Sequence, residues 1–312
     1  MRDLRSYDPH ARRTRLRGPS SIQIQTIDRC NGSCIMCPYS SLTKTGPANV
    51  MDDGLYGQIL DELRRTGSVK SFILMLQNEP LLDRQLPDRV RLARKALGRS
   101  VRIKTVTNGA PLTAAGIDAL LDSGIDHVMV SIDAIREETY DSIRHGLDFR
   151  RVVRNTLSLI ERLGPRRVGI RFLRQRENEG EENAFASHWR SHGVGVLFTE
   201  PSNRAGSLES YERIKNRRPD PWKKVVYPVL NRLVPACPLP FTSLNVLWDG
   251  RVIMCCNDWG PRDTVGDLSR LTVQEVWNGE KINHYRHLLW THHAEQSPVC
   301  ADCSLSVSFW KI

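Results

Sequence analysis

Short apolar runs alternate with longer amphipathic segments between residues 20 and 200. The apolar runs predict six strands, at residues 22–27, 69–76, 101–106, 127–132, 167–172 and 194–198. In the segments between them, apolar residues recur three and four positions apart, as Leu55, Ile59 and Leu63 do, which is the spacing of one helix face. The predicted helices are residues 52–65, 87–97, 113–123, 149–163 and 181–192.

Strands that alternate with helices predict an α/β fold. A helix that connects two strands returns the chain to the same edge of the sheet, so the strands are expected to be parallel, with right-handed crossovers. The first predicted strand runs directly into a loop that carries three cysteines. Because α/β folds bind ligands at the carboxyl ends of their strands, the sequence predicts a site at this edge.

The pattern changes after residue 200. Charged residues become dense and Pro219 and Pro221 interrupt them, which predicts a linker with some helix. Two apolar runs, 244–248 and 251–254, then flank Asp249-Gly250 and predict a β-hairpin. Two further helices are predicted at 272–277 and 282–290. The predicted organisation is a basic N-terminal arm (1–19), an α/β domain (20–200), a linker (201–235) and a C-terminal domain (236–312).

Composition and charge narrow the class of protein. Hydrophobic residues make up 40% and charged residues 26%, the balance of a soluble globular protein. The longest apolar stretch, 71–76, is far shorter than a membrane span, and no terminal segment has the pattern of a secretion signal, so we expect a cytoplasmic protein. The net charge of +10 indicates either a solvated basic surface or an anionic partner. Without a nucleic-acid-binding motif, we expect neither nucleic acid nor membrane as a partner.

The eight cysteines form two groups that are separated by 199 residues without a cysteine. The first group is Cys30, Cys34 and Cys37, and the second is Cys237, Cys255, Cys256, Cys300 and Cys303. Disulfides do not persist in a reducing compartment, where clustered thiols more often bind metal.

The first group reads Cys30-Asn-Gly-Ser-Cys34-Ile-Met-Cys37. Three thiolates on one loop can bind three irons of a [4Fe–4S] cube and leave the fourth iron open, which indicates chemistry at the metal. The alternative is a zinc site that a distant residue completes, because zinc normally takes four ligands.

In the second group, Cys237, Cys255, Cys300 and Cys303 provide four thiolates. Such a set can close either a zinc site or a second [4Fe–4S] cluster, and spacing alone leaves both open. One cysteine remains, and we expect it to be Cys256, the neighbour of a ligand.

The cysteine loop and three further motifs resemble the radical S-adenosylmethionine (SAM) enzymes. Gln77-Asn78-Glu79-Pro80 follows the second predicted strand, where that family has Gly-Gly-Glu-Pro; Thr107-Asn108-Gly109 follows the third, and Ser131-Ile-Asp133 ends the fourth. Gln77 and Asn78 depart from the two glycines, whereas the Glu-Pro half is intact. The resemblance implies a partial (β/α)6 barrel over about residues 20–200.

The resemblance also implies a mechanism. Cys30, Cys34 and Cys37 would hold the cube, SAM would bind its open iron, and reduction would release a 5′-deoxyadenosyl radical. The resemblance implies that four further side chains bind SAM. Glu79 would bind its ammonium, Ser131 and Asp133 its ribose or carboxylate, and Arg171 its carboxylate. Asn108 is a weaker candidate. The alternatives are a strand-end ion pair of Asp133 with Arg171 and a turn role for Asn108.

The C-terminal block resembles the SPASM or Twitch extension, which holds auxiliary clusters. The matching segments are Cys237-Pro, Asp249-Gly250, Cys255-Cys256-Asn-Asp258, Val265-Gly-Asp-Leu268, Glu275-Val-Trp277 and Cys300-Ala-Asp-Cys303. Five cysteines in place of seven favour the shorter form with one auxiliary cluster. In this context iron–sulfur outweighs zinc, so the implied cofactors are two [4Fe–4S] clusters and SAM.

Size and layout are similar to sugar and aminocyclitol epimerases and dehydrogenases of antibiotic biosynthesis. We therefore expect hydrogen abstraction from a carbinol carbon of such a small molecule, with a flavodoxin or ferredoxin as electron donor. Our main expectation is epimerisation with Cys256 as the catalytic hydrogen donor. The alternatives are dehydrogenation to a ketone through the auxiliary cluster, radical modification of a peptide, and a structural role for Cys256.

Overall fold

A computed structural model describes residues 16–41, 46–216 and 235–305. Six strands lie in parallel in the order β1-β3-β4-β5-β7-β8, which confirms the predicted α/β sheet. These strands are β1 (Ser21–Ile24), β3 (Ser71–Ile73), β4 (Arg102–Thr107), β5 (His127–Ser131), β7 (Val168–Leu173) and β8 (Gly195–Thr199). Both β1 and β3 are shorter than predicted, because the chain leaves the ladder early to form the loops that line the site.

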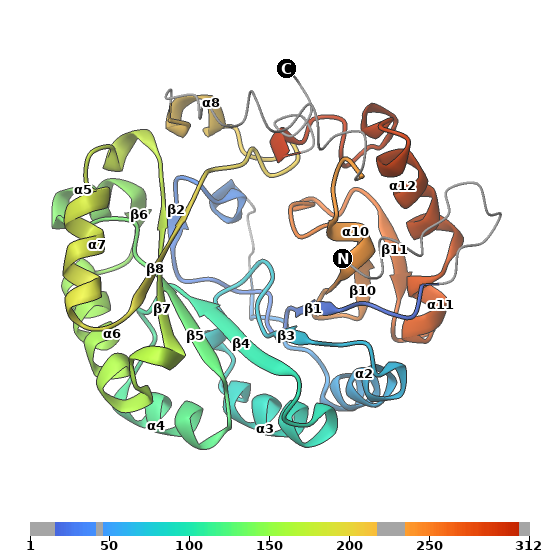
Figure 1. Cartoon of the computed structure of the whole chain (residues 1–312), viewed down its shortest axis with the longest axis horizontal. Helices are drawn as coiled ribbons and strands as arrows, with labels where there is room; N and C mark the ends of the chain where they lie inside the picture. The colour runs from blue at the N-terminus through green and yellow to red at the C-terminus, as the bar shows by residue number, and fades with distance from the viewer. Residues whose placement is uncertain (1–15, 42–45, 217–234, 306–312) are drawn as a thin grey trace.

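Helices cover the outer side of this sheet (Figure 1). They are α2 (Asp53–Thr66), α3 (Leu86–Leu97), α4 (Ala114–Asp122), α6 (Phe149–Leu163) and α7 (Glu182–Ser191), close to the predicted bounds. Asp52, Thr113 and Asp148 each cap a helix by accepting a backbone N–H, which explains where α2, α4 and α6 begin. On β3, Phe72 is fully buried and its ring contacts Tyr56 of α2, so this face of the sheet packs on the helices.

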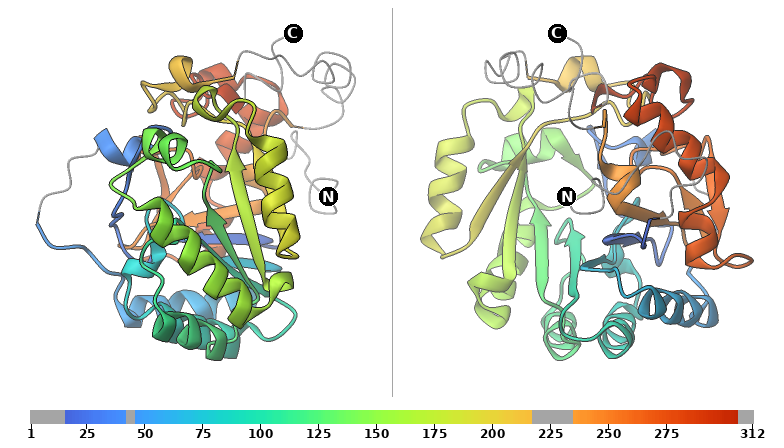
Figure 2. Two further views of the ribbon diagram at one scale, coloured as in Figure 1. Left: turned by 90° about the vertical axis from the view of Figure 1, so that its left-hand side faces the viewer. Right: turned by 45° about the vertical axis from the view of Figure 1, so that its right-hand side comes forward.

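The C-terminal region continues the same sheet. Strand β9 (Ser243–Val246) pairs in parallel with β1, β10 (Arg251–Ile253) pairs antiparallel with β9, and β11 (Thr264–Asp267) pairs antiparallel with β10. The predicted hairpin is therefore confirmed, and it extends the six parallel strands to a nine-stranded sheet. Figure 2 shows these orange strands beside the blue N-terminal strand. All four residues of β9 are buried, as expected for a strand between two neighbours.

Short helices complete this region. They are α10 (Leu239–Thr242), α11 (Val273–Trp277) and α12 (Glu280–Trp290), and α12 begins two residues before the predicted start. The short α8 (Tyr211–Ile214) belongs to the preceding segment, and its Ile214 packs with Ile143 and Leu173. Arg286 of α12 is fully buried, donates to the carbonyls of Pro240 and Trp277 at 2.9 and 2.6 Å, and lies 4.2 Å from the Trp277 ring centroid. It therefore joins α12 to α10 and α11.

Like α10 and β11, three small elements near the cysteine loop were not predicted: β2 (Ser33–Cys34), α5 (Glu137–Ile143) and β6 (Arg144–His145). Strands β2 and β6 pair antiparallel, with Cys34 opposite Arg144, and the Ile35 amide donates to the Ile143 carbonyl at 3.0 Å. This small sheet fixes the cysteine loop to the segment that follows β5.

Each of the four predicted segments falls partly outside the described residues. The residues not described are 1–15 of the basic arm, 42–45 of the α/β domain, 217–234 of the linker and 306–312 of the C-terminal domain. In the described part of the chain, no helix is both long and apolar enough to cross a membrane.

Candidate functional site

A cavity of about 270 Å³ lies at the carboxyl ends of the parallel strands. The loops after β1 and β3 and the ends of β4, β5 and β7 all contribute to its wall. It brings together the three cysteines of the first group and all the predicted SAM-binding residues. The lining includes Cys30, Cys34, Cys37, Glu79, Asn108, Ser131, Asp133, Arg171 and Cys256.

The thiols of the first group are partly buried in the cavity wall, beside other polar groups. Burial raises the pKa of Cys30 to about 12 and that of Cys34 to about 11, so both hold a proton when no metal is bound. The backbone N–H of Gly32 donates to the Cys30 sulfur, and the N–H of Tyr39 donates to the Cys37 sulfur. Hydrogen bonds of this kind stabilise thiolates and tune iron–sulfur clusters.

Asp133 forms a buried ion pair, but its partner is Arg144 and not Arg171. The Asp133 carboxylate is fully buried and accepts from Arg144 Nε at 3.0 Å, from Arg144 Nη2 at 2.5 Å and from the Leu173 amide at 2.7 Å. Arg144 Nη1 also lies 3.9 Å from the Cys34 sulfur. These contacts favour the ion-pair reading of Asp133, which then supports the cysteine loop through Arg144. No motif marks Arg144, because its position depends on the unpredicted α5 and β6.

Glu79 lies at the start of a 3-10 turn, η2 (Pro80–Leu82), with 2% of its surface exposed. Its carboxylate accepts from Thr107 Oγ1 at 2.7 Å, from the Asn108 amide at 2.7 Å and from the Leu81 amide at 3.1 Å. Burial nevertheless raises the pKa of Glu79 to about 7. A cationic ligand group in the cavity would favour its charged form.

The side chain of Asn108 is already engaged. Its Oδ1 accepts from the Ala110 amide at 2.9 Å, and its Nδ2 donates to Asn31 Oδ1 in the cysteine loop at 2.8 Å. The turn reading of Asn108 is therefore favoured. Ser131, at the end of β5, lines the cavity beside it.

Two arginines make one wall of the cavity cationic. Arg171, on β7, lines the cavity as predicted, and it lies close enough to Asp133, Arg204 and Cys256 for their charges to act on it. Arg204, which the sequence did not single out, lines the same wall and donates to Asn257 Oδ1 at 3.0 Å. It sits in a turn with a φ of 51°, and nothing in the local sequence distinguishes that turn from an ordinary surface loop.

The second group of cysteines surrounds a smaller, separate cavity. Its lining includes Cys237, Cys255, Cys300 and Cys303, the four predicted auxiliary ligands. The Leu239 amide donates to the Cys237 sulfur, and the Asn257 amide donates to the Cys255 sulfur at 3.4 Å, which repeats the pattern of the first group. These four thiols therefore have the donor chemistry of a closed cluster site.

Cys255 lines the auxiliary cavity, and its neighbour Cys256 lines the larger one. A hydrogen bond from the Cys255 thiol lowers the pKa of Cys256, with help from Arg204. Because a metal-bound Cys255 has no proton to donate, this lowering belongs to the metal-free protein.

No three His, Cys, Asp or Glu side chains within residues 16–41, 46–216 and 235–305 converge on a single point as ligands of one ion would. A [4Fe–4S] cube is larger than one ion, and its cysteines surround it.

The chain belongs to the radical SAM superfamily, whose family model matches residues 24–186, just over half of its length. A second model, the SPASM iron–sulfur cluster-binding domain, matches residues 237–304. SAM and [4Fe–4S] clusters are therefore its cofactors, and the two groups of thiols fit the clusters in number and in donor chemistry.

Among curated proteins, the chain is similar to the S-adenosyl-L-methionine-dependent 2-deoxy-scyllo-inosamine dehydrogenase of Niallia circulans. The two are 22% identical over 289 residues, which cover 91% of this chain and 92% of the relative. Among solved structures, it is similar to BtrN in complex with AdoMet and 2-DOIA, with a TM-score of 0.61, 20% identity and coverage of 91% and 92%. SuiB of Streptococcus suis bound to the precursor peptide SuiA has a TM-score of 0.68 at 13% identity, with coverage of 86% and 66%.

Proposed function

We propose that this radical SAM enzyme dehydrogenates a secondary alcohol of an aminocyclitol or related sugar to a ketone, in antibiotic biosynthesis. The observation that carries the proposal is the pair of neighbouring thiol cavities, an open one with three predicted ligands and a closed one with four. The likeness to an aminocyclitol dehydrogenase along nine-tenths of both chains supports the reaction. It favours dehydrogenation, our alternative above, over the epimerisation that we expected first.

The balance of the reaction requires both cavities. Oxidation of a carbinol to a ketone removes one hydrogen atom from carbon, then one proton from oxygen and one electron. SAM and the first cluster supply the radical that takes the hydrogen atom, and the auxiliary cluster supplies an acceptor for the electron. We propose a flavodoxin or ferredoxin as the external reductant of the first cluster.

The chain's own residues bind and orient. We propose that Glu79 accepts hydrogen bonds from the SAM ammonium, because it is the carboxylate in the cavity that has no arginine partner. Arg171 would pair with the SAM carboxylate in the fork geometry that a guanidinium offers. The ion pair of Asp133 with Arg144 would hold the cysteine loop in place, because Arg144 contacts Cys34.

Radical epimerisation is the second candidate, because Cys256 faces the SAM cavity and is not among the four thiols of the auxiliary one. A thiol there could return a hydrogen atom to the opposite face of a planar carbon radical. Its sulfur hydrogen exchanges with solvent, so an epimerised product formed in deuterated water would carry one deuterium on carbon.

Anaerobic turnover with 2-deoxy-scyllo-inosamine and a panel of related aminocyclitols and amino sugars tests the proposal. We expect one 5′-deoxyadenosine for each ketone, no carbon-bound deuterium from deuterated water, and ketone formation that persists in Cys256→Ala. An epimer that carries solvent deuterium and disappears in Cys256→Ala, with 5′-deoxyadenosine still formed, would establish the second candidate instead. Matched reactions of Cys30→Ala, which lacks a predicted ligand of the first cluster, provide the blank.

Peptide modification has weaker support. The likeness to SuiB shows a shared fold, since the identity is 13%. No feature of the described residues favours a peptide over a small molecule.

A further inference from the structure

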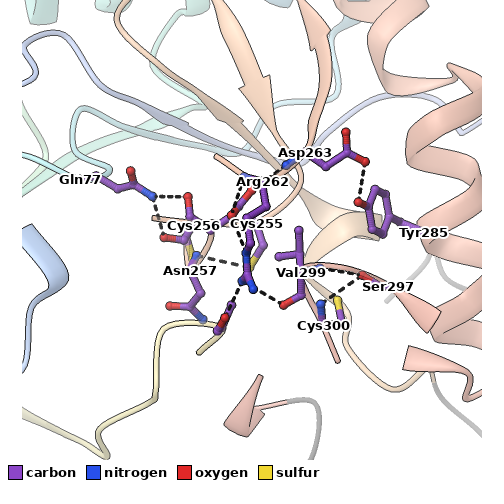
Figure 3. A network of polar contacts seen from close by, with 12 residues as sticks. Gln77, Cys255, Cys256, Asn257, Arg262, Asp263, Tyr285, Ser297, Val299 and Cys300 are labelled. Carbon is purple, nitrogen blue, oxygen red and sulfur yellow. Dashed lines mark hydrogen bonds and ion pairs between the residues drawn. The ribbon is translucent and has the colours of Figure 1, made fainter. Parts of the chain in front are cut away.

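The side chain of Gln77 joins the loop after β3 to the C-terminal region. Gln77 follows β3, and its side-chain Nε2 donates to the Asp258 carbonyl at 2.9 Å and to the Cys256 carbonyl at 3.4 Å (Figure 3). Only 7% of its surface is exposed. The radical SAM enzymes that this sequence resembles have glycine here, and glycine has no side chain that could make either bond.

Both ends of this bridge are themselves fixed. Gln25 Nε2 donates to the Gln77 carbonyl at 3.3 Å, and the Gln25 amide donates to Val246 of β9 at 2.9 Å. At the other end, the Asp258 amide donates to the Cys255 carbonyl at 3.0 Å and closes a turn over residues 255–258. The Gln77 amide therefore joins two ordered backbones and does not simply fill space.

The turn that Gln77 holds separates the two cavities. Within this turn, Cys255 lines the auxiliary cavity and Cys256 lines the larger one. On the other side of the bridge, Glu79 follows Gln77 by two residues and also lines the larger cavity. A shift of this turn would change the separation between an auxiliary ligand and the SAM-binding loop. Such a separation governs how fast an electron or a hydrogen atom can pass between neighbouring groups.

We propose that Gln77 is a positioning residue that locks the turn 255–258 to the SAM-binding loop, so that radical formation in one cavity stays coupled to oxidation in the other. The structural part of this proposal concerns the metal-free chain. Its consequence for the product rests on the function proposed above.

Hydrogen exchange in the metal-free protein tests the structural part without any substrate. In Gln77→Ala we expect amides within 255–262 to exchange on the order of tenfold faster than in the wild type, the effect of losing about one buried hydrogen bond. Gln77→Leu keeps a side chain of similar volume that cannot donate a hydrogen bond, so it should show the same increase. Amides of β4 and β5 should keep their protection in both variants.

Gln58→Ala is the matched control. Gln58 of α2 also joins the barrel to the C-terminal region, since its Nε2 donates to the Leu268 carbonyl at 3.2 Å, but it lies in neither cavity lining. Its loss should leave exchange at 255–262 unchanged. Wild-type protection at 255–262 in both Gln77 variants, or equal acceleration in Gln58→Ala, overturns the proposal.

The reconstituted enzyme provides the second readout. Both Gln77 variants should keep wild-type iron content, while the ratio of 5′-deoxyadenosine to oxidised product rises several-fold. Faster local exchange with an unchanged ratio would contradict the coupling role. If the wild type itself forms no ketone, the proposed function fails, whereas the exchange result still decides whether Gln77 locks the turn.

Discussion

The two groups of cysteines differ in how the chain brings them together. Cys30, Cys34 and Cys37 come from one loop of eight residues and line a wide cavity at the carboxyl edge of the sheet. The four auxiliary thiols come from three segments that the C-terminal fold assembles around a small cavity. Three local thiols would leave a coordination position beside open space, and four distant thiols would close their site. The first arrangement suits chemistry on a bound ligand, and the second suits electron transfer.

Removing a ligand of the first group should have the largest effect. We expect Cys30→Ala, Cys34→Ala and Cys37→Ala each to abolish formation of 5′-deoxyadenosine, because SAM cleavage needs the open iron that these thiols hold. Chromatography of reduced reactions measures the nucleoside. Cys256→Ala is the control and should still cleave SAM. A 5′-deoxyadenosine signal at the wild-type level in any of the three variants would refute the assignment.

Removing an auxiliary ligand should instead separate cleavage from product formation. We expect Cys300→Ala/Cys303→Ala, which leaves two auxiliary thiols, to keep SAM cleavage, to lose the ketone, and to fall from about eight to about four irons per chain. Iron analysis and product analysis on the same sample measure both quantities. Loss of SAM cleavage together with the ketone would show that the two sites do not have separate roles.

The buried Asp133–Arg144 pair supports the first group, and a second pair, Asp258–Arg262, lies beside the auxiliary thiols. We expect Asp133→Asn to lower the free energy of unfolding by about 3–5 kcal/mol, because it leaves the Arg144 cation buried without its partner. Urea denaturation of the metal-free protein measures this loss. The exposed pair Arg150–Glu137 provides a control, since Glu137→Gln should cost less than about 1 kcal/mol. Equal effects of both substitutions would argue that Asp133 is free to bind a ligand.

Glu79 should make the folded protein less stable as the pH rises. Burial raises its pKa to about 7 in the folded protein, whereas an unfolded glutamate ionises near its ordinary value of 4.5. The stabilising contribution is present below that ordinary value and is lost as pH rises towards 7. The advantage of wild type over Glu79→Gln should therefore shrink by up to about 3 kcal/mol between pH 5 and pH 8.

Glu181 provides the matched control for this pH dependence. It is also buried, but hydrogen bonds from Thr139 Oγ1, the Ile135 amide and Arg136 lower its pKa. Its stabilising contribution is present above the ordinary glutamate pKa and is lost only at lower pH. The difference between wild type and Glu181→Gln should stay constant between pH 5 and pH 8, and a flat profile for Glu79→Gln would contradict the burial argument.

Local patterns predicted much of this architecture. The spacing of Leu55, Ile59 and Leu63 gave α2 almost to the residue, and Asp249-Gly250 gave the hairpin of β9 and β10. The parallel pairing of β9 with β1 left no local signal, because the partners are about 220 residues apart. Arg144 was missed for a similar reason, since tertiary contacts and no motif bring it to Asp133.

In the candidate site, too, the residues with a local sequence signal could be predicted, and those placed by tertiary contacts could not. The spacing of Cys30, Cys34 and Cys37 was enough to predict them as cluster ligands. Glu79 and Arg171 could be predicted because they lie at or near the ends of predicted strands. Cys255 lines one cavity and its neighbour Cys256 the other because of the turn at 255–258, which only the folded chain defines.

The central claim is that SAM binds to only one of the two iron–sulfur sites. Electron paramagnetic resonance of the reduced protein, with and without SAM, tests it most directly. We expect SAM to change the spectrum of Cys300→Ala/Cys303→Ala, which keeps the first site and only two auxiliary thiols. The triple variant Cys30→Ala/Cys34→Ala/Cys37→Ala, which keeps the auxiliary site, should give the same spectrum with and without SAM. A SAM-dependent change in the triple variant would contradict the account, because it would place an open iron among the four auxiliary thiols.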